Sequence, residues 1–337
     1  MQRTIFLDYI RVLACVMVVV IHSPCSSEVT DGFWTACSTI FGIPCNGLFF
    51  MVSGYLLLPL KDETGVFLKK RFSKVVFPTL FWTFFYIGIN SYIYNIKFEE
   101  LWYIIFSIPF SRQGTGWLWF MYVMMGLYLI APIISSWIKN VSRKEFTFYI
   151  VLCLITSVFP LLDHVVEIIP GTYNILYYFA GYIGYFLLGA YLKKYPIRLN
   201  TIGILSLYFI PIVMALLSKA RGYDIVYAEF SNYLSFFTIS MCISIFCFFM
   251  KVIPIHGDKA IIVKVVQEFS KCSFGIYLIH HFVIHQIIDR EYLIIHYGAL
   301  LQIVISAILT IIISFIIVYT ISWLPYSQYI IGYKQKG

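Results

Sequence analysis

Two polar side chains, Arg11 and His22, lie eleven residues apart in an otherwise apolar run near the start of the sequence. At about 100° per residue, a helix places them within about 20° of one another on one face and about 16 Å apart along its axis. A neutral imidazole accepts a proton near neutral pH, and a guanidinium binds anions or stabilises developing negative charge. The pattern predicts acid–base or anion-directed chemistry on one helix face, with Asp8 as the local partner of Arg11.

Both residues also admit plainer interpretations. An Asp8–Arg11 ion pair would neutralise two charges inside an apolar helix and do no more than fix its packing. A histidine near the end of a membrane helix, as we expect for His22, can lie at the interface without a chemical role. The two side chains on one stripe indicate function more strongly than either does by itself.

Three basic residues, Lys70, Arg71 and Lys74, gather where the third apolar run begins. Point charges and a planar guanidinium at this place suit phosphate groups. The same charges also suit a helix anchor that meets anionic lipid at the cytosolic face, and the spacing by itself favours this second interpretation.

Polar and aromatic residues mark two further runs. Asn46 and the Ser53–Gly54 pair lie in the second run, where a small polar step permits close helix packing or a kink. Trp117 and Trp119 open the fourth run. Two tryptophans there are typical of an aromatic belt at the membrane interface, and a platform for stacking on sugar rings is the alternative.

Four residues of the ninth run, Tyr277, His280, His281 and His285, carry polar groups into an apolar segment. His281 and His285 are one helical turn apart, which suits metal ligands, but no acidic residue completes a metalloprotease pattern. We therefore expect no metal, and we interpret the histidines as helix–helix hydrogen-bonding groups.

The amino-acid composition indicates that these residues lie in a membrane-embedded protein. Of 337 residues, 61% are hydrophobic and 12% are charged, and this charged fraction is about half that of a typical soluble chain. The apolar runs are about 20 residues long and do not alternate, which favours spanning helices over barrel strands. The net charge of +8 falls mainly between these runs, so we attribute it to membrane topology and expect no nucleic-acid partner.

The loops predict the topology. Ten apolar spans are expected, each to within a few residues, at 5–23, 37–60, 72–95, 117–138, 146–162, 172–192, 200–217, 230–250, 270–289 and 298–323. With a cytosolic amino terminus, 18 of the 24 lysines and arginines lie in inner segments and five in outer segments, with Arg11 within the membrane. The sequence therefore predicts an all-α polytopic membrane helix bundle, a single domain over 1–337, with both termini cytosolic. Arg11 then lies at depth and His22 near the outer side.

The eight cysteines form no CxxC pair, and five of them lie inside apolar runs away from the first outer loop, at Cys15, Cys153, Cys242, Cys247 and Cys272. We expect buried free thiols. Cys25, Cys37 and Cys45 lie near the first outer loop, where the sequence leaves a disulfide open without choosing a pair.

Together these stretches resemble the acyltransferase-3 family of membrane acyltransferases, over nearly the whole chain. Lys74 stands where that family often has a second arginine, and Tyr55 stands where it often has phenylalanine. The resemblance is carried by Asp8-Tyr9-Ile10-Arg11 followed by His22, Phe49-Phe50-x-x-Ser53-Gly54-Tyr55-Leu56, Arg71-x-x-Lys74 before Pro78, Trp117-Leu118-Trp119-Phe120, Tyr185-Phe186-Leu187-Leu188-Gly189 and Ser273-x-Gly275-Ile276-Tyr277-Leu278-Ile279-His280.

The resemblance implies an O-acyltransferase in the inner (cytoplasmic) membrane, which moves an acyl group, usually acetyl, from cytosolic acyl-CoA to a hydroxyl of an extracytoplasmic glycan or lipid-linked saccharide. It implies His22 as the catalytic histidine, Arg11 as its partner, and Arg71 and Lys74, with Lys70 beside them, as contacts of the CoA phosphates. Acetyl-CoA is then the acyl donor, and no metal takes part. Seven further residues are expected to support the site: Asp8, Asn46, Ser53, Trp117, Trp119, Tyr277 and His280.

Two other functions fit the same residues. An intramembrane arginine equally suits a translocation path, so an exporter or flippase of a polysaccharide or lipid-linked glycan is the first alternative. A membrane subunit without catalytic turnover is the second. The residues also leave open whether His22 acts only as a base or carries an acyl intermediate.

Overall fold

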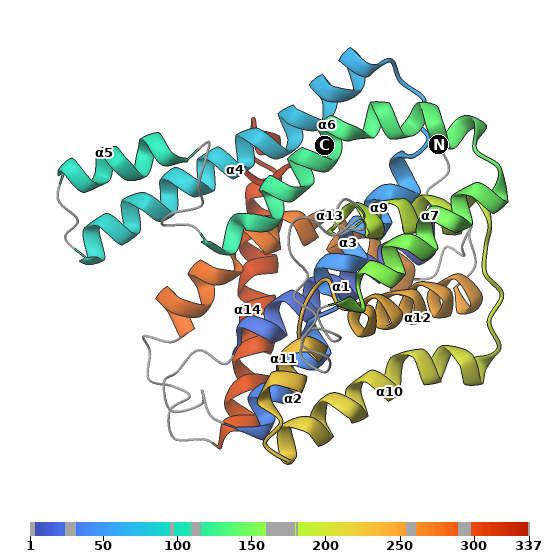
Figure 1. Cartoon of the computed structure of the whole chain (residues 1–337). Helices are drawn as coiled ribbons and strands as arrows, with labels where there is room; N and C mark the ends of the chain where they lie inside the picture. The colour runs from blue at the N-terminus through green and yellow to red at the C-terminus, as the bar shows by residue number, and fades with distance from the viewer. Residues whose placement is uncertain are drawn as a thin grey trace.

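The computed structural model describes residues 4–23, 32–94, 98–108, 116–159, 179, 181–253, 261–288 and 298–335, and their regular elements are all helical (Figure 1). The elements are α1 (Ile5–His22), α2 (Phe33–Gly42), α3 (Cys45–Leu57), α4 (Thr64–Tyr94), α5 (Phe98–Ser107), η1 (Gly116–Leu118), α6 (Trp119–Asn140), α7 (Arg143–Thr156), α9 (Ile183–Lys194), α10 (Thr201–Ala220), α11 (Asp224–Phe230), α12 (Phe236–Val252), α13 (Ile261–Phe282), the π-helix η3 (Val283–Ile288), α14 (Ala299–Ser322) and α15 (Gln328–Ile331).

The predicted all-α membrane bundle is confirmed. Within the described residues, six helical segments are long and apolar enough to cross a bilayer, at Ile5–His22, Phe33–Leu57, Thr64–Ile93, Trp119–Asn140, Thr201–Ala220 and Ala299–Ser322. The count of ten spans and the cytosolic position of the termini stay predictions. The end of the predicted fifth span, 160–162, and 172–178 and 180 of the predicted sixth lie outside the described residues.

Helix α1 occupies the interior of the bundle, where it packs against α2, α3, α12, α13 and α14 (Figure 1). Its apolar side chains are buried along its length, among them Phe6, Ile10, Met17 and Val19. A helix that is enclosed in this way needs apolar residues on most of its circumference, so the few polar ones must have partners inside the protein.

Several predicted boundaries differ from the structure; α13, for example, begins at Ile261 rather than at 270, and α12 begins at Phe236 rather than at 230. The second span is two helices, α2 and α3, which are separated at Ile43 and Pro44. Proline has no backbone N–H to continue the hydrogen bonds of α2 but is tolerated at the start of α3. Helix α4 begins at Thr64 and is 31 residues long, so the basic cluster lies within a helix rather than in a loop before it.

The backbones of helices α3 and α9 pack unusually close together, with one glycine from each helix at the contact. A Cβ atom on Gly54 would overlap the backbone carbonyl of Phe186, and a Cβ atom on Gly189 would overlap that of Met51. Small residues allow helix backbones to approach this closely in membranes. Close packing is therefore the role of Gly54 in the Ser53–Gly54 step that the sequence singled out.

Lysines cap helix ends at one end of the bundle. Lys194 donates hydrogen bonds to the carbonyls of Ile138 and Val141 at 3.0 and 3.1 Å, where α6 ends. The last carbonyls of a helix lack partners within it and carry partial negative charge, so a lysine there is stabilising.

The described cysteines are free thiols, as expected, at Cys15, Cys37, Cys45, Cys153, Cys242, Cys247 and Cys272. Cys37 and Cys45 are therefore not joined to each other. Cys25, the third candidate for a disulfide, lies outside the described residues.

Candidate active site

Helices α1 and α13 run side by side in the same direction, and polar contacts join them near both ends. Near the start of α1, the Ser270 hydroxyl donates a hydrogen bond to Asp8 Oδ1 at 2.7 Å. At its end, the ring centroids of His22 and His280 are 5.2 Å apart. The predicted stripe on α1 is thus lined by α13 from the level of Arg11 to the level of His22.

Arg11 is only partly enclosed. Its Nη1 atom lies 3.7 Å from Asp8 Oδ1, and the Arg11 side chain is 32% exposed while that of Asp8 is 2% exposed. The Asp8 carboxylate lies closer to the Ser270 hydroxyl than to the Arg11 guanidinium. An ion pair that only fixed packing would enclose both charges, whereas here the carboxylate is enclosed and the guanidinium stays accessible.

Arg71 and Arg11 both lie within electrostatic range of Tyr128. The charges of both guanidinium groups act on Tyr128 of α6, and the Tyr128 hydroxyl hydrogen-bonds with Ser53 of α3. Arg71 also lies 5.9 Å from the centre of the Phe67 ring, which supports its guanidinium. Four helices therefore bring two cations and two hydroxyl groups to the same end of the bundle.

The rest of the basic cluster lies at the surface of that end. Lys70 forms an ion pair with Asp62 at 2.9 Å, with both side chains largely exposed. Lys74 is exposed as well. Arg71 is therefore partly buried, whereas the two lysines lie at the exposed rim.

Lys193 and Lys61 lie near the end of α3. Lys193 donates a hydrogen bond to the Leu58 carbonyl at 2.9 Å and sits 5.8 Å from the centre of the Tyr55 ring. Burial lowers the pKa of Lys193, and the nearby charge of Lys61 lowers it further. Tyr55 packs edge-on against Phe6 of α1. Lys193 therefore lies at the same end of the bundle as Asp8.

At the opposite end of α1, His22 meets three further histidines. Its ring centroid is 5.2 Å from that of His280 and 6.1 Å from that of His281, and His285 lies 4.2 Å from His281. His285 belongs to the π-helix η3, a rare conformation that often occurs at functional sites. In the described part of the chain, no group of three or more His, Cys, Asp or Glu side chains is arranged to hold a metal ion.

Trp117 fixes one of these histidines. Its ring stacks on His281 with centroids 3.9 Å apart and an interplanar angle of 10°. The Tyr277 hydroxyl donates a hydrogen bond to the Trp117 carbonyl at 2.7 Å, and the Tyr86 ring packs edge-on at 5.1 Å. One face of Trp117 is thus occupied by an imidazole, and Tyr277 supports the cluster through the Trp117 backbone.

Two other predicted supporting residues have different surroundings. Trp119 packs against Tyr182 and Tyr233, with ring centroids 5.2 and 5.4 Å away. Asn46 is buried, and its Oδ1 atom has no hydrogen-bond partner among the described residues. A buried amide oxygen without a partner is costly, so a bound donor would stabilise it.

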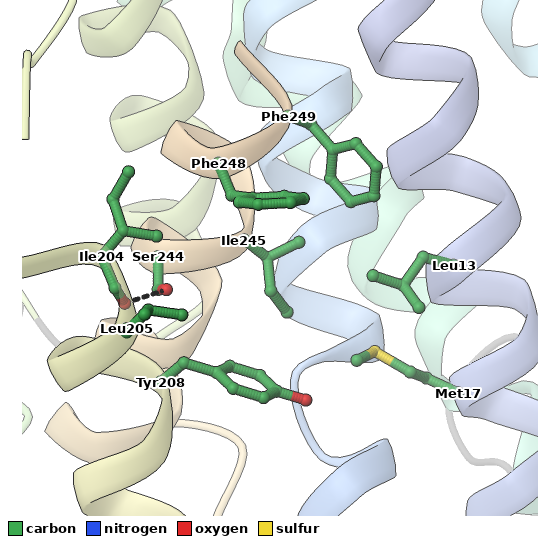
Figure 2. A pocket seen from close by; sticks show the side chains of 9 residues that line it. All are labelled: Leu13, Met17, Ile204, Leu205, Tyr208, Ser244, Ile245, Phe248 and Phe249. Atoms are coloured by element: carbon green, nitrogen blue, oxygen red, sulfur yellow. Dashed lines mark hydrogen bonds between the residues drawn. The ribbon is translucent and has the colours of Figure 1, made fainter. Parts of the chain in front are cut away.

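A cavity of about 200 Å³ lies between α1, α10 and α12 (Figure 2). Leu13 and Met17 line it from α1, and Tyr208 and Phe248 reach it from the other two helices. At about 100° per residue, Leu13 and Met17 lie on the face of α1 away from Arg11. The cavity, which is almost entirely apolar, is therefore separate from the stripe that carries Arg11 and His22.

Sequence reasoning missed three contributors. His281 was interpreted as a helix–helix hydrogen-bonding group, and its stack on Trp117 joins segments far apart in the chain. Tyr128 and Tyr86 carried no signal, because they are two among 27 tyrosines. The one signal in the sequence was the presence of a second histidine, His281, directly after His280 in the ninth run.

A family model described as an acyltransferase domain, acyltransferase-3, matches residues 4–319. Neither curated proteins nor solved structures gave a match.

Proposed function

Because this chain belongs to the acyltransferase-3 family, we propose that it is an O-acyltransferase of the inner (cytoplasmic) membrane, with cytosolic acyl-CoA as donor and a hydroxyl of an extracytoplasmic glycan or lipid-linked saccharide as acceptor. The observation that carries the proposal is the α1 stripe, which has an accessible arginine at one end and a histidine cluster at the other. The acyl group is acetyl in this proposal.

The donor binds at the end of the bundle that holds Arg71. The CoA phosphates contact Arg71, with Lys70 and Lys74 at the rim, since guanidinium and ammonium groups bind phosphate by charge-assisted hydrogen bonds. The thioester arm extends between the helices past Arg11. Arg11 then lies between the phosphate site and His22, where its guanidinium pairs with the bound donor on the path of the arm toward His22.

His22 performs the proton transfer. Its imidazole takes the proton of the acceptor hydroxyl as the hydroxyl oxygen attacks the thioester carbonyl. The C–S bond then breaks, and the proton passes from His22 to the departing sulfur. The products are an O-acyl ester and free CoA thiol, so atoms and charge balance.

The experiment that tests this proposal uses the full chain in proteoliposomes, with radiolabelled acetyl-CoA and the glycan fraction of host membranes. We expect label to enter the glycan, with one equivalent of CoA thiol released for each ester formed. If no label is transferred while the protein is folded, the proposed reaction is wrong.

We expect Arg71→Ala to raise the KM for acetyl-CoA about tenfold or more, since a charge-assisted hydrogen bond contributes about 1.5–3 kcal/mol. Lys74→Ala should have a smaller effect, because the Lys74 side chain is exposed. Lys139→Ala, at an exposed position near the end of α6, is the control and should behave as wild type. Equal KM values for all four proteins would contradict the proposed phosphate site.

The location of the glycan in cells that carry His22→Ala distinguishes the acyl-transfer hypothesis from the export hypothesis. Acyl transfer predicts that the glycan reaches the cell surface without its acyl groups. Glycan that accumulates inside the cell would instead support a translocation path at Arg11. Unchanged glycan chemistry in both His22 and Arg11 variants would support a subunit without turnover.

A further inference from the structure

The hydrogen bonding of His280 determines which of its ring nitrogens carries the proton. His280 Nδ1 lies 2.6 Å from the backbone carbonyl oxygen of Tyr277. A carbonyl oxygen only accepts hydrogen bonds, so Nδ1 must be the donor. In the neutral ring, the lone pair is therefore on Nε2.

This lone pair is buried without a partner. His280 is 1% exposed, and its Nε2 atom has no hydrogen-bond partner in the part of the chain that the structure describes. Leaving a buried acceptor unpaired is costly, and native proteins seldom do so without a functional reason. The atom requires an N–H or O–H donor.

His22 is the neighbour best placed to supply that donor. Its ring centroid is 5.2 Å from that of His280, with the planes tilted by 43°. At this separation, rotation of the His22 ring brings one of its nitrogens to His280 Nε2. His281 is farther away, at 6.4 Å, and its ring is held against Trp117 by the parallel stack.

We propose that His280 is a positioning residue for His22, which it holds in a single tautomer by accepting a hydrogen bond from one ring nitrogen. This inference rests on the proposed function, because it assigns His22 the role of base. The second nitrogen of His22 then carries the lone pair and faces the acceptor hydroxyl. Catalytic imidazoles commonly need such an orienting partner, and without it part of the population presents N–H where the base is needed.

The hydrogen bond from His22 to His280 also stabilises the protonated, positively charged form of His22. Once His22 has taken the hydroxyl proton, both of its nitrogens carry hydrogen, and the one that faces His280 Nε2 remains paired. No proton has to leave the pair, because His22 returns its newly acquired proton to the departing sulfur. His280 thus acts through His22 and does not touch the substrate.

Two substitutions separate this role from a structural one. The amide of His280→Gln reaches the position of Nε2 and supplies an acceptor there, but it loses the donor to Tyr277. The amide of His280→Asn reaches the position of Nδ1 and keeps that donor, but it supplies nothing at Nε2. We expect His280→Asn to lose about 100-fold in kcat with little change in KM, and His280→Gln to stay within about tenfold of wild type.

The experiment measures label transfer from radiolabelled acetyl-CoA in proteoliposomes, with thermal unfolding to establish that each variant is folded. Activity in His280→Asn with loss in His280→Gln would show that the Tyr277 contact is structural, and wild-type activity in both would show that neither contact matters. Either outcome overturns the inference. If both variants are inactive, nitrogen NMR of isotope-labelled histidines decides: one His22 tautomer in the wild type and a mixture in His280→Asn supports the inference, and the same tautomer in both overturns it.

Failure of the proposed function is recognised separately. If His22→Ala transfers label as well as the wild type does, His22 is not the base and the proposed reaction is wrong at its centre. If His22→Ala is inactive while both His280 variants match the wild type, only the inference about His280 is wrong.

Discussion

We expect His22→Ala to reduce acyl transfer by a factor of about 100 to 10,000, the range that a general base contributes, without unfolding the protein. The imidazole is the group of the histidine cluster that lies on the same α1 face as Arg11. His22 is partly exposed rather than sealed in the core, so its removal leaves a smaller packing defect than a fully buried residue would. The measurement is the rate of CoA thiol release that depends on added glycan.

The control for this variant lies on the outer surface of the bundle. Ile202 on α10 is 74% exposed, and Ile202→Ala should match the wild type in rate and in thermal unfolding. His22→Gln, which preserves size and hydrogen bonding but provides no base at neutral pH, should be as inactive as His22→Ala. Substantial activity in either His22 variant would exclude His22 as the base.

We expect Gly54→Ala and Gly189→Ala each to destabilise the protein by about 3 kcal/mol or more, at the upper end of the cost of overpacking. The added methyl group would overlap the backbone of the facing helix, at Phe186 in one case and Met51 in the other. No side-chain rotation relieves a collision with backbone, so α3 and α9 must separate. Thermal unfolding of the purified protein in detergent is the measurement.

Two other glycines provide the matched controls. A Cβ atom on Gly88 of α4 or Gly126 of α6 would meet no atom within 4 Å, so an alanine there should leave the melting temperature unchanged or slightly raise it. If Gly54→Ala and Gly189→Ala melt like these controls, the two helices do not approach as closely as described.

Features that depend on local geometry could be predicted from the sequence. The positions of Arg11 and His22 on one face follow from the helical repeat alone, and so does the placement of Asp8 one turn before Arg11. The helical class follows from the length and uniformity of the apolar runs. The Ser53–Gly54 step permits close helix packing or a kink on sequence grounds, and the structure shows close packing at Gly54.

Features that depend on which segments meet could not be predicted. The hydrophobic periodicity of α13 does not indicate that His281 packs on Trp117 or that His280 faces His22, because a helix that is apolar all round has several equivalent faces. The same limit hid Tyr128, which comes within electrostatic range of Arg11 and Arg71 only because the helices pack together in this arrangement.

The central claim is that this chain transfers an acyl group to a surface glycan by way of His22. Mass spectrometry of the host's surface glycans tests it most directly, in cells that lack the gene and in cells complemented with wild type or with His22→Ala. We predict that one class of O-acyl group disappears on deletion, returns with the wild-type protein and does not return with His22→Ala. An acyl pattern that is the same in all these cells would contradict the claim.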